Sequence, residues 1–252
     1  MGRLRAAGCV FAEDEAALLI EGGADPAALD AMVARRVAGE PLEQVLGWAE
    51  FCGLRIAVEP GVFVPRRRTE FLARQAIARA RPGAVVLDLC CGSGALGAAV
   101  AATVAGVELH AADVDPAAVR CAGRNLTALG GTVYQGDLYE ALPGGLRGRV
   151  DVLVANVPYV PSAEVGHLPP EARDHEPRTA LDGGNDGLEV LRRVAAGAPA
   201  WLAPGGSLLI ETSDRQAAAA LDAYTAAGLE PQVAEDDELG ATVVLGVRSV
   251  ED

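Results

Sequence analysis

The sequence contains no lysine, and all 21 of its basic residues are arginines. Against them stand 35 acidic residues, so the formal net charge is −14. A partner bound mainly through phosphate groups requires clustered cations, because counterion release drives such binding. The charge balance therefore argues against a nucleic-acid substrate, although Arg66, Arg67 and Arg68 form one basic cluster.

Long apolar runs are also missing, although hydrophobic residues make up 50% of the chain. No segment approaches the roughly 20 apolar residues of a membrane-spanning helix. Acidic residues interrupt the apolar part of residues 1–23, where a signal peptide needs an unbroken core. We therefore expect a soluble, cytoplasmic protein with no membrane partner. The five cysteines lack metal-ligand spacing and the adjacent pair Cys90–Cys91 suits a reducing compartment, so we expect no metal site.

Composition and turn signals predict three parts along the chain. These are a short N-terminal helical segment (1–45), a hairpin linker with a connecting helix (46–81) and a main domain (82–252). Residues 12–38 are typical of two short helices, the second with Asp25 as its N-cap. Aromatic and β-branched residues around turn glycines predict a hairpin within 47–64. Thr69 is the expected N-cap of the connecting helix.

The main domain alternates strands with helices. Strands are expected at 84–89, 107–112, 132–135, 150–155, 206–212, 229–234 and 242–247, and helices at 94–105, 116–129, 187–199 and 215–227. This alternation is typical of an α/β, doubly wound fold whose ligand binds at the carboxyl ends of parallel strands. The last two strands are separated only by a short loop. We therefore expect a seven-stranded, mostly parallel sheet with an antiparallel last strand.

Residues 160–186 do not follow this pattern, because they are rich in proline and lack periodicity. Long loops inside compact domains are uncommon and are usually functional or disordered. A flexible surface insertion is one interpretation. The position directly after residues 156–159 favours a lid over a pocket.

A glycine-rich turn follows the first strand of the main domain. Gly92, Gly94 and Gly97 match the pattern G-x-G-x-x-G, in which the backbone can approach a ligand at a helix N-terminus. Alone the match is weak, because tight strand-to-helix turns also use glycine for packing.

Acidic residues near the ends of three strands strengthen that signal. Asp88 precedes the glycines, and Asp113 ends the next strand, where a carboxylate can accept both ribose hydroxyls. Asp137 ends the third strand and either contacts an adenine amino group or belongs to a turn. Asp115, ahead of a proline, is expected to be a helix N-cap.

Both a dinucleotide and S-adenosylmethionine present adenosine to such a site. An acid just before the glycines, Asp88, suits the cationic methionine tail better than a pyrophosphate. A hydride-transfer enzyme would also need a catalytic Tyr-Lys pair or a histidine. The chain has no lysine, and His110 lies within a predicted strand, where a structural role is expected.

The segment "NVPY", residues 156–159, follows a buried strand on the same edge. The Asn156 carboxamide offers an acceptor and a donor in one plane. Pro158 fixes the backbone, and Tyr159 supplies a stacking face. Such a pocket can hold a planar nitrogen opposite a methyl group, so that positioning supplies most of the rate. The alternative is a strand that ends in proline and a packed tyrosine.

Taken together, the motifs resemble the protein-(glutamine-N5) methyltransferases of the HemK/PrmC type. "NVPY" is similar to their Asn-Pro-Pro-Tyr motif, and "LDLCCGSGALG" to their cofactor loop. The hairpin region, the segment "PRRRTEFL" and "HEPRTALDGGNDGLEVLRR" also resemble family segments, in the same order, from about residue 41 onward. Asn-Pro-Pro-Tyr alone is shared with adenine-N6 methyltransferases, whereas the combination is far more specific.

The resemblance implies a Rossmann-like class I methyltransferase fold, S-adenosyl-L-methionine as methyl donor and S-adenosyl-L-homocysteine as product. It implies a protein glutamine as acceptor, in most members on the Gly-Gly-Gln loop of a translation release factor. By position, the cofactor contacts fall on Cys90, Cys91, Gly92, Ser93, Gly94, Asp113, Leu138 and Asn156. The glutamine pocket falls on Asn156, Val157, Pro158 and Tyr159, and Asn156, Pro158 and Tyr159 are the expected catalytic residues.

The chain departs from the family pattern at several positions. Cys90 replaces the usual first glycine of the loop, and Val157 replaces the first proline of the acceptor motif. Arg67 and Arg68 replace a Pro-acid pair, and the helical segment before Gly47 is short.

Three other functions remain open from the sequence. The same pocket could methylate an amino group of a nucleic acid, although the acidic charge balance argues against it. The glycine pattern alone leaves a dinucleotide-dependent oxidoreductase possible in principle. A regulator that binds the cofactor without catalysis would not require Asn156 and Tyr159.

Overall fold

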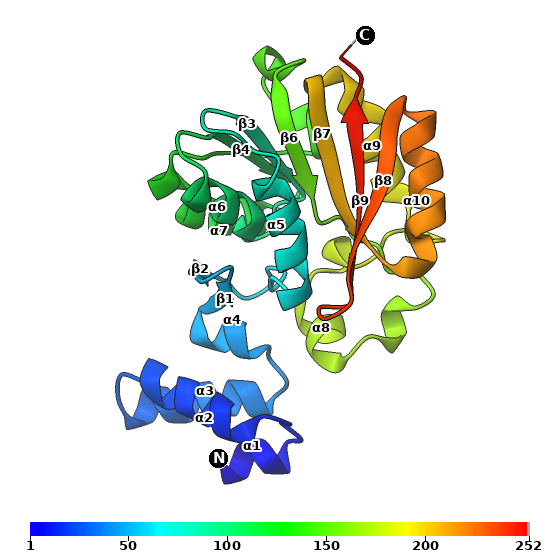
Figure 1. Cartoon of the computed structure of the whole chain (residues 1–252). Coiled ribbons are helices and arrows are strands. Elements are labelled where there is room, and N and C mark those ends of the chain that lie inside the picture. Colours follow the sequence, from blue (N-terminus) through cyan, green and yellow to red (C-terminus); the bar gives the residue numbers. More distant parts are fainter. Residues whose placement is uncertain (251–252) are drawn as a thin grey trace.

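The computed structural model describes residues 1–250, in which a twisted sheet carries helices on both faces (Figure 1). The sheet strands are β3 (Val85–Leu89), β4 (Glu108–Asp113), β5 (Thr132–Gln135), β6 (Val150–Ala155), β7 (Leu202–Thr212), β8 (Leu229–Asp236) and β9 (Ala241–Arg248). Their spatial order is β5-β4-β3-β6-β7-β9-β8. The first five strands are parallel, and β9 pairs antiparallel with both β7 and β8. The expected α/β fold, with its seven-stranded sheet and antiparallel last strand, is confirmed.

Two hydrophobic cores sandwich the sheet. One face packs against α5 (Glu70–Ile77), α6 (Ala95–Thr103) and α7 (Pro116–Leu126), and the other against α9 (Glu189–Gly197) and α10 (Asp214–Ala226). Strand side chains alternate between the cores: Val86 joins the first, whereas Leu87 and Leu89 join the second. Every residue of β3 is buried, which explains why four of its five residues are apolar, Asp88 being the exception.

Four short helices form a separate N-terminal cluster at the bottom of Figure 1. They are α1 (Gly2–Ala6), α2 (Ala12–Gly22), α3 (Pro26–Val37) and α4 (Leu42–Leu46), with Leu4, Leu19 and Val45 buried between them. The two helices expected within 12–38 are confirmed, and the Asp25 side chain caps α3 by accepting from Ala28 N–H at 2.8 Å. Helices α1 and α4 have five residues each, too few to show a helical period.

The predicted hairpin connects this cluster to the sheet. Strands β1 (Trp48–Phe51) and β2 (Leu54–Ala57) pair antiparallel. The Asn125 side chain on α7 holds the end of the hairpin, accepting from Ala57 N–H at 2.9 Å and donating to Ala57 C=O at 2.9 Å. Beyond β2, the chain runs to a 3-10 turn at Arg67–Thr69 and then to α5.

The N-cap prediction for Thr69 is confirmed only in its position. Thr69 precedes α5, but its side chain makes no capping hydrogen bond, because it is buried beside Glu211 instead. Residues 160–186 are ordered, so of the two interpretations of this segment the flexible surface insertion is wrong. They contain α8 (Pro170–His175) and 3-10 turns at Val165–His167 and Arg178–Ala180, and Val160 bridges to Asp182. Long-range contacts order this segment, and such contacts leave no periodic signal.

Among the helices of residues 1–250, none combines the length and the apolar character that a membrane crossing requires.

Candidate active site

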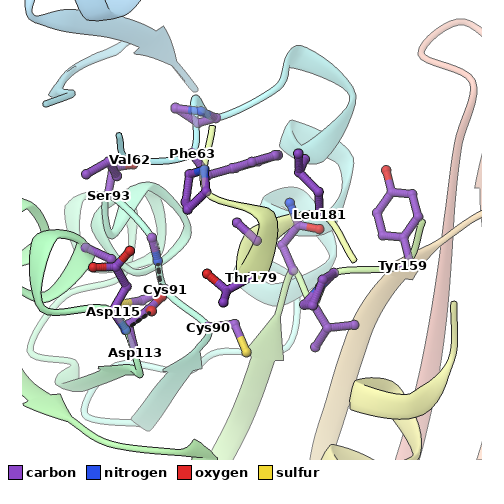
Figure 2. Close-up of a pocket in the computed structure, with 18 of the residues that line it drawn as sticks. Val62, Phe63, Cys90, Cys91, Ser93, Asp113, Asp115, Tyr159, Thr179 and Leu181 are labelled. Atoms are coloured by element: carbon purple, nitrogen blue, oxygen red, sulfur yellow. Dashed lines mark hydrogen bonds between the residues drawn. The ribbon is translucent and has the colours of Figure 1, made fainter. Parts of the chain in front are cut away.

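A cavity of about 660 Å³ lies at the carboxyl edge of the parallel strands. The strand order places the residues at or just after the ends of β5, β4, β3 and β6 along this edge as Asp137, Asp113, Cys90 and Asn156, and all four line the cavity. Figure 2 shows Asp113 and Asp115 on one side, Tyr159 on the other and Cys90 with Thr179 between them. Asp113 and Asp115 therefore lie at one end of a continuous cavity, and residues 156–159, which follow β6, lie toward the other (Figure 2).

The glycine-rich turn crosses the middle of this edge. Cys91 N–H donates to Ala112 C=O at 3.1 Å, and Gly94 N–H donates to Cys91 C=O at 2.7 Å, which fixes the turn before α6. Cys90 has φ of 54°, the left-handed conformation that glycine adopts without a steric penalty. The departure at this position therefore places a strained residue directly on the cavity wall.

Asp113 is held by the backbone with both carboxylate oxygens. Its Oδ2 accepts from Gly92 N–H at 2.9 Å and its Oδ1 accepts from Asp115 N–H at 2.9 Å. Burial raises the pKa of Asp113, and these hydrogen bonds oppose that rise. Each oxygen has a second lone pair, so the carboxylate can still accept two ligand hydroxyls. Asp115 is the N-cap of α7, accepting from Ala117 N–H at 2.7 Å, as expected.

Residues 156–159 leave β6 at Ala155 and turn into the cavity. Asn156, Val157, Pro158 and Tyr159 all line it. Val157 and Pro158 are buried, whereas Asn156 and Tyr159 are half-buried. The segment therefore presents a carboxamide and an aromatic ring on a rigid backbone.

Comparison with known proteins gives the family. Residues 53–167 match the Methyltransferase small domain family. A release factor glutamine methyltransferase of Geobacter sulfurreducens is 39% identical over 88% of this chain and 78% of its own length. The 4-amino-L-phenylalanine/4-methylamino-L-phenylalanine methyltransferase of Streptomyces pristinaespiralis is 38% identical over 78% of this chain and 69% of its own length.

The chain belongs to the release factor glutamine methyltransferase family. It is an S-adenosylmethionine-dependent methyltransferase. A methyltransferase structure from Pyrococcus furiosus, with a TM-score of 0.59 at 18% identity, covers 78% of this chain and 90% of its own, which shows the same fold. Membership of the family excludes the dinucleotide-dependent oxidoreductase that the glycine pattern alone left open.

Two of the residues predicted to contact the cofactor, Asp88 and Gly94, do not line the cavity. Asp88 is fully buried in β3, and its Oδ2 accepts from Gly97 N–H on α6 at 2.9 Å. Burial raises the pKa of Asp88 to about 7. The expectation that Asp88 directly faces a cationic tail is not met, because the side chain turns toward α6 beneath the glycine turn. Its Oδ1 has no hydrogen-bond partner within residues 1–250.

Asp137 and Leu138, which follow the edge strand β5, line the cavity. Leu138 has φ of 49°, a strained conformation for a residue with a side chain. Arg193 on α9 donates to Asp137 Oδ2 at 2.7 Å and also lines the cavity. Nothing in the sequence linked Arg193 to this site, because α9 lies 56 residues away from Asp137 along the chain.

In this methyltransferase, residues 156–159 are held by long-range contacts that the local sequence pattern did not indicate. Gln216 Nε2 donates to Tyr159 C=O at 2.9 Å and to Asp186 C=O at 3.0 Å. A Cβ at Gly183 would lie 2.6 Å from Pro158 C=O, and one at Gly187 would lie 2.2 Å from Tyr159 C=O. The spacing of Ser213 and Gln216 signals a capping box, which the structure contains, but not these long-range bonds.

The segment expected to be a lid forms one wall of the cavity, through residues including Leu168, Thr179 and Leu181. Glu176, after α8, anchors it: its carboxylate accepts from Val64 N–H at 3.0 Å and from Arg66 at 2.6 Å. Burial raises the pKa of Glu176, and Arg66 opposes that rise.

A second anchor reaches the same wall from the N-terminal helices. Buried Arg36 on α3 pairs with Glu15 on α2 at 2.7 Å and with Glu171 on α8 at 2.7 Å. Glu171 also lines the cavity. The ion-pair chain therefore links the N-terminal segment to the active-site wall.

Proposed function

We propose that the protein transfers a methyl group from S-adenosylmethionine to the side-chain amide nitrogen (N5) of a glutamine in a protein. We further propose that this glutamine lies in the Gly-Gly-Gln loop of a translation release factor. The observation that carries the proposal is that Asn156, Pro158 and Tyr159 line the same cavity as the glycine turn and Asp113.

The residues at the β4 and β5 end fit the adenosine part of the cofactor. Asp113 keeps a lone pair on each oxygen for the ribose hydroxyls, and Asp137 with Leu138 would border the adenine. Cys90, Cys91, Gly92 and Ser93 would lie beside the methionine tail. When bound, S-adenosylmethionine supplies a methyl group on a positively charged sulfur. The acidic edge of the sheet complements that charge.

The acceptor end supplies position rather than a strong base. The Asn156 carboxamide oxygen would accept a hydrogen bond from the acceptor N–H, and the Tyr159 ring would border its plane. Accepting bonds of this kind weaken amide conjugation and orient the nitrogen lone pair. The amide nitrogen then bonds to the methyl carbon while the carbon–sulfur bond breaks, and one nitrogen proton passes to solvent.

The protein substrate is proposed from the relatives together with the walls of the cavity. Several relatives at about 40% identity are named release factor glutamine methyltransferases. The cavity is bounded by three separate parts of the chain, since Phe63 follows the hairpin, Thr179 belongs to residues 160–186 and Asn156 follows β6. Such an enclosed site suits the tip of an extended loop.

Mass analysis of candidate substrates tests this proposal. Recombinant release factors and ribosomal proteins are incubated with the enzyme and isotopically labelled donor, digested and sequenced by mass spectrometry. We expect a gain of one labelled methyl group on the glutamine of the Gly-Gly-Gln peptide. A labelled methyl group on no glutamine peptide would contradict the proposal.

An arylamine is the second acceptor to test, because the Streptomyces pristinaespiralis relative is named for such a substrate. An aromatic amine and a carboxamide both present a planar nitrogen. Parallel reactions with 4-amino-L-phenylalanine, with an unmethylated adenine-containing oligonucleotide and with a release factor distinguish the three acceptor classes. The proposal requires the release factor to give the highest kcat/KM.

A further inference from the structure

The arginine cluster Arg66–Arg68 has one member that none of the contacts above explains. Arg66 pairs with Glu176, and Arg67 is exposed and does not line the cavity. Arg68 lines the cavity, although it is not expected to contact the cofactor. Its partners are Glu211 and Tyr159, 143 and 91 residues further along the chain.

Glu211 requires such a partner because it is a buried carboxylate. It lies near the end of β7, the strand next to β6, and only 2% of the residue is exposed. Arg68 Nε donates to Glu211 Oε1 at 3.1 Å. Within residues 1–250, Glu211 Oε2 has no partner of good hydrogen-bond geometry. The Arg68 side chain is itself 46% exposed, so the burial is one-sided: removal of Arg68 would leave the Glu211 carboxylate buried without its cation.

The Tyr159 hydroxyl lies between these two groups. It accepts from Arg68 Nη2 and donates to Glu211 Oε1 at 3.3 Å. The guanidinium carbon of Arg68 also lies 5.5 Å from the centre of the Tyr159 ring. The outer end of the ring is therefore held by two charged groups from separate elements.

The backbone of Tyr159 is fixed independently. Gln216 bonds to its carbonyl oxygen, and Gly183 and Gly187 pack against the segment. The contacts of Arg68 and Glu211 reach only the hydroxyl end of the side chain. Arg68 can therefore determine where the ring points without determining where the segment runs.

We propose that Arg68 and Glu211 are positioning residues that fix the orientation of the Tyr159 ring and thereby the plane in which the acceptor amide is held. This inference rests on the proposed function, because the ring borders the acceptor only if the acceptor binds at Asn156–Tyr159. An acceptor nitrogen misplaced by a tilted ring loses its alignment with the methyl carbon, which lowers kcat.

The matched substitutions are Arg68→Met, Arg68→Lys and Arg67→Met. The first removes the charge and the fork of donors, the second retains the charge with a single donor group, and the third changes an exposed neighbour. We expect Arg68→Met to lower kcat by about tenfold or more while the cofactor Kd stays within about twofold. Arg68→Lys should recover part of that loss, and Arg67→Met should retain the parental kcat.

A pH profile separates positioning from a general loss of packing. Burial raises the pKa of Glu211, while Thr69 and Arg68 oppose that rise. Thr69, Arg68 and Tyr159 are the polar or charged groups that face the carboxyl. Without Arg68, the pKa of Glu211 rises further, so the pH below which activity declines should move upward in Arg68→Met and not in Arg67→Met. An unchanged profile and kcat in Arg68→Met would overturn the inference.

A measurement without any acceptor distinguishes this inference from the proposed function. The chain has only four tyrosines, so ring-labelled tyrosine gives few NMR signals, and Tyr159→Phe identifies the one from Tyr159. Arg68→Met should shift or broaden that signal, and Arg67→Met should leave it in place. If the signal responds but no acceptor is methylated, the proposed function fails and the positioning contact stands. If Arg68→Met leaves the signal unchanged, the positioning role is wrong even in an active enzyme.

Discussion

The buried Asp88 carboxyl should make the stability of this methyltransferase depend on pH. In the unfolded chain its pKa is close to 3.8, whereas burial in the folded protein raises the pKa to about 7. Between these two values the folded state binds one proton more than the unfolded state. The free energy of unfolding therefore falls as pH rises through this range, by about 1.4 kcal/mol for each pH unit. Above about pH 7, both states are ionised and the contribution is constant.

Asp88→Asn removes this titration while it retains an oxygen that can accept from Gly97 N–H. Between about pH 5.5 and the folded-state pKa of about 7, the pH rises by about 1.5 units, and beyond that the contribution of Asp88 is constant. From about pH 5.5 to about pH 8.5 the free energy of unfolding of the parent should therefore fall by about 2 kcal/mol relative to that of the variant. Urea denaturation of both proteins at several pH values measures this difference, in which the other titrating groups cancel. A stability difference that stays constant within about 0.5 kcal/mol across the range would refute the reasoning, since Asp88 would then be ionised throughout.

Four further substitutions test the site and its supports. In Asn156→Ala, the cofactor Kd measured by calorimetry should stay within a few-fold while turnover falls about a hundredfold, because only the acceptor loses its partner. Weak cofactor binding with normal turnover would contradict that role. Asp113→Ala should do the reverse, weakening cofactor binding by about tenfold or more, and parental affinity would rule out the ribose contact. Gly183→Ala places a Cβ 2.6 Å from Pro158 C=O and should reduce kcat about tenfold, whereas Gly144→Ala, with open space around it, serves as the control. Arg36→Met should cost about 3 kcal/mol of unfolding free energy because Glu15 stays buried, against less than about 1 kcal/mol for the exposed Arg3→Met; equal effects on denaturation would show that the buried pair contributes no more than a surface pair.

The elements of the sheet followed from local signals. Short, mostly apolar runs such as β3 and β6, each with a single aspartate, indicated strands buried on both faces, and helical periods between them indicated parallel pairing. Parallel pairing brings all carboxyl ends to one edge. For that reason the sequence alone predicted that Asp113, Asp137 and Asn156 would share a site, and all three line the cavity.

Side-chain direction was not available from the same signals. Asp88 and Asp113 both stand near strand ends, yet Asp88 turns beneath the glycine turn and Asp113 lines the cavity. Which way each carboxylate points depends on which backbone N–H groups α6 and the turn present to it. The direction of each carboxylate is therefore set by the packing of α6 and not by the sequence of the strand.

The sequence by itself determined the strand order along the chain, the glycine turn and the chemistry of residues 156–159, because these depend on periodicity and on residue type at short range. Only the tertiary structure decided the ordered wall formed by residues 160–186, the Arg36–Glu171 link and the contact of Arg68 with Tyr159 and Glu211. Those pairings join positions far apart in the chain, so no local sequence pattern indicates which charged residue will pair with which. Their geometry exists only once separate elements have packed and excluded water from between them.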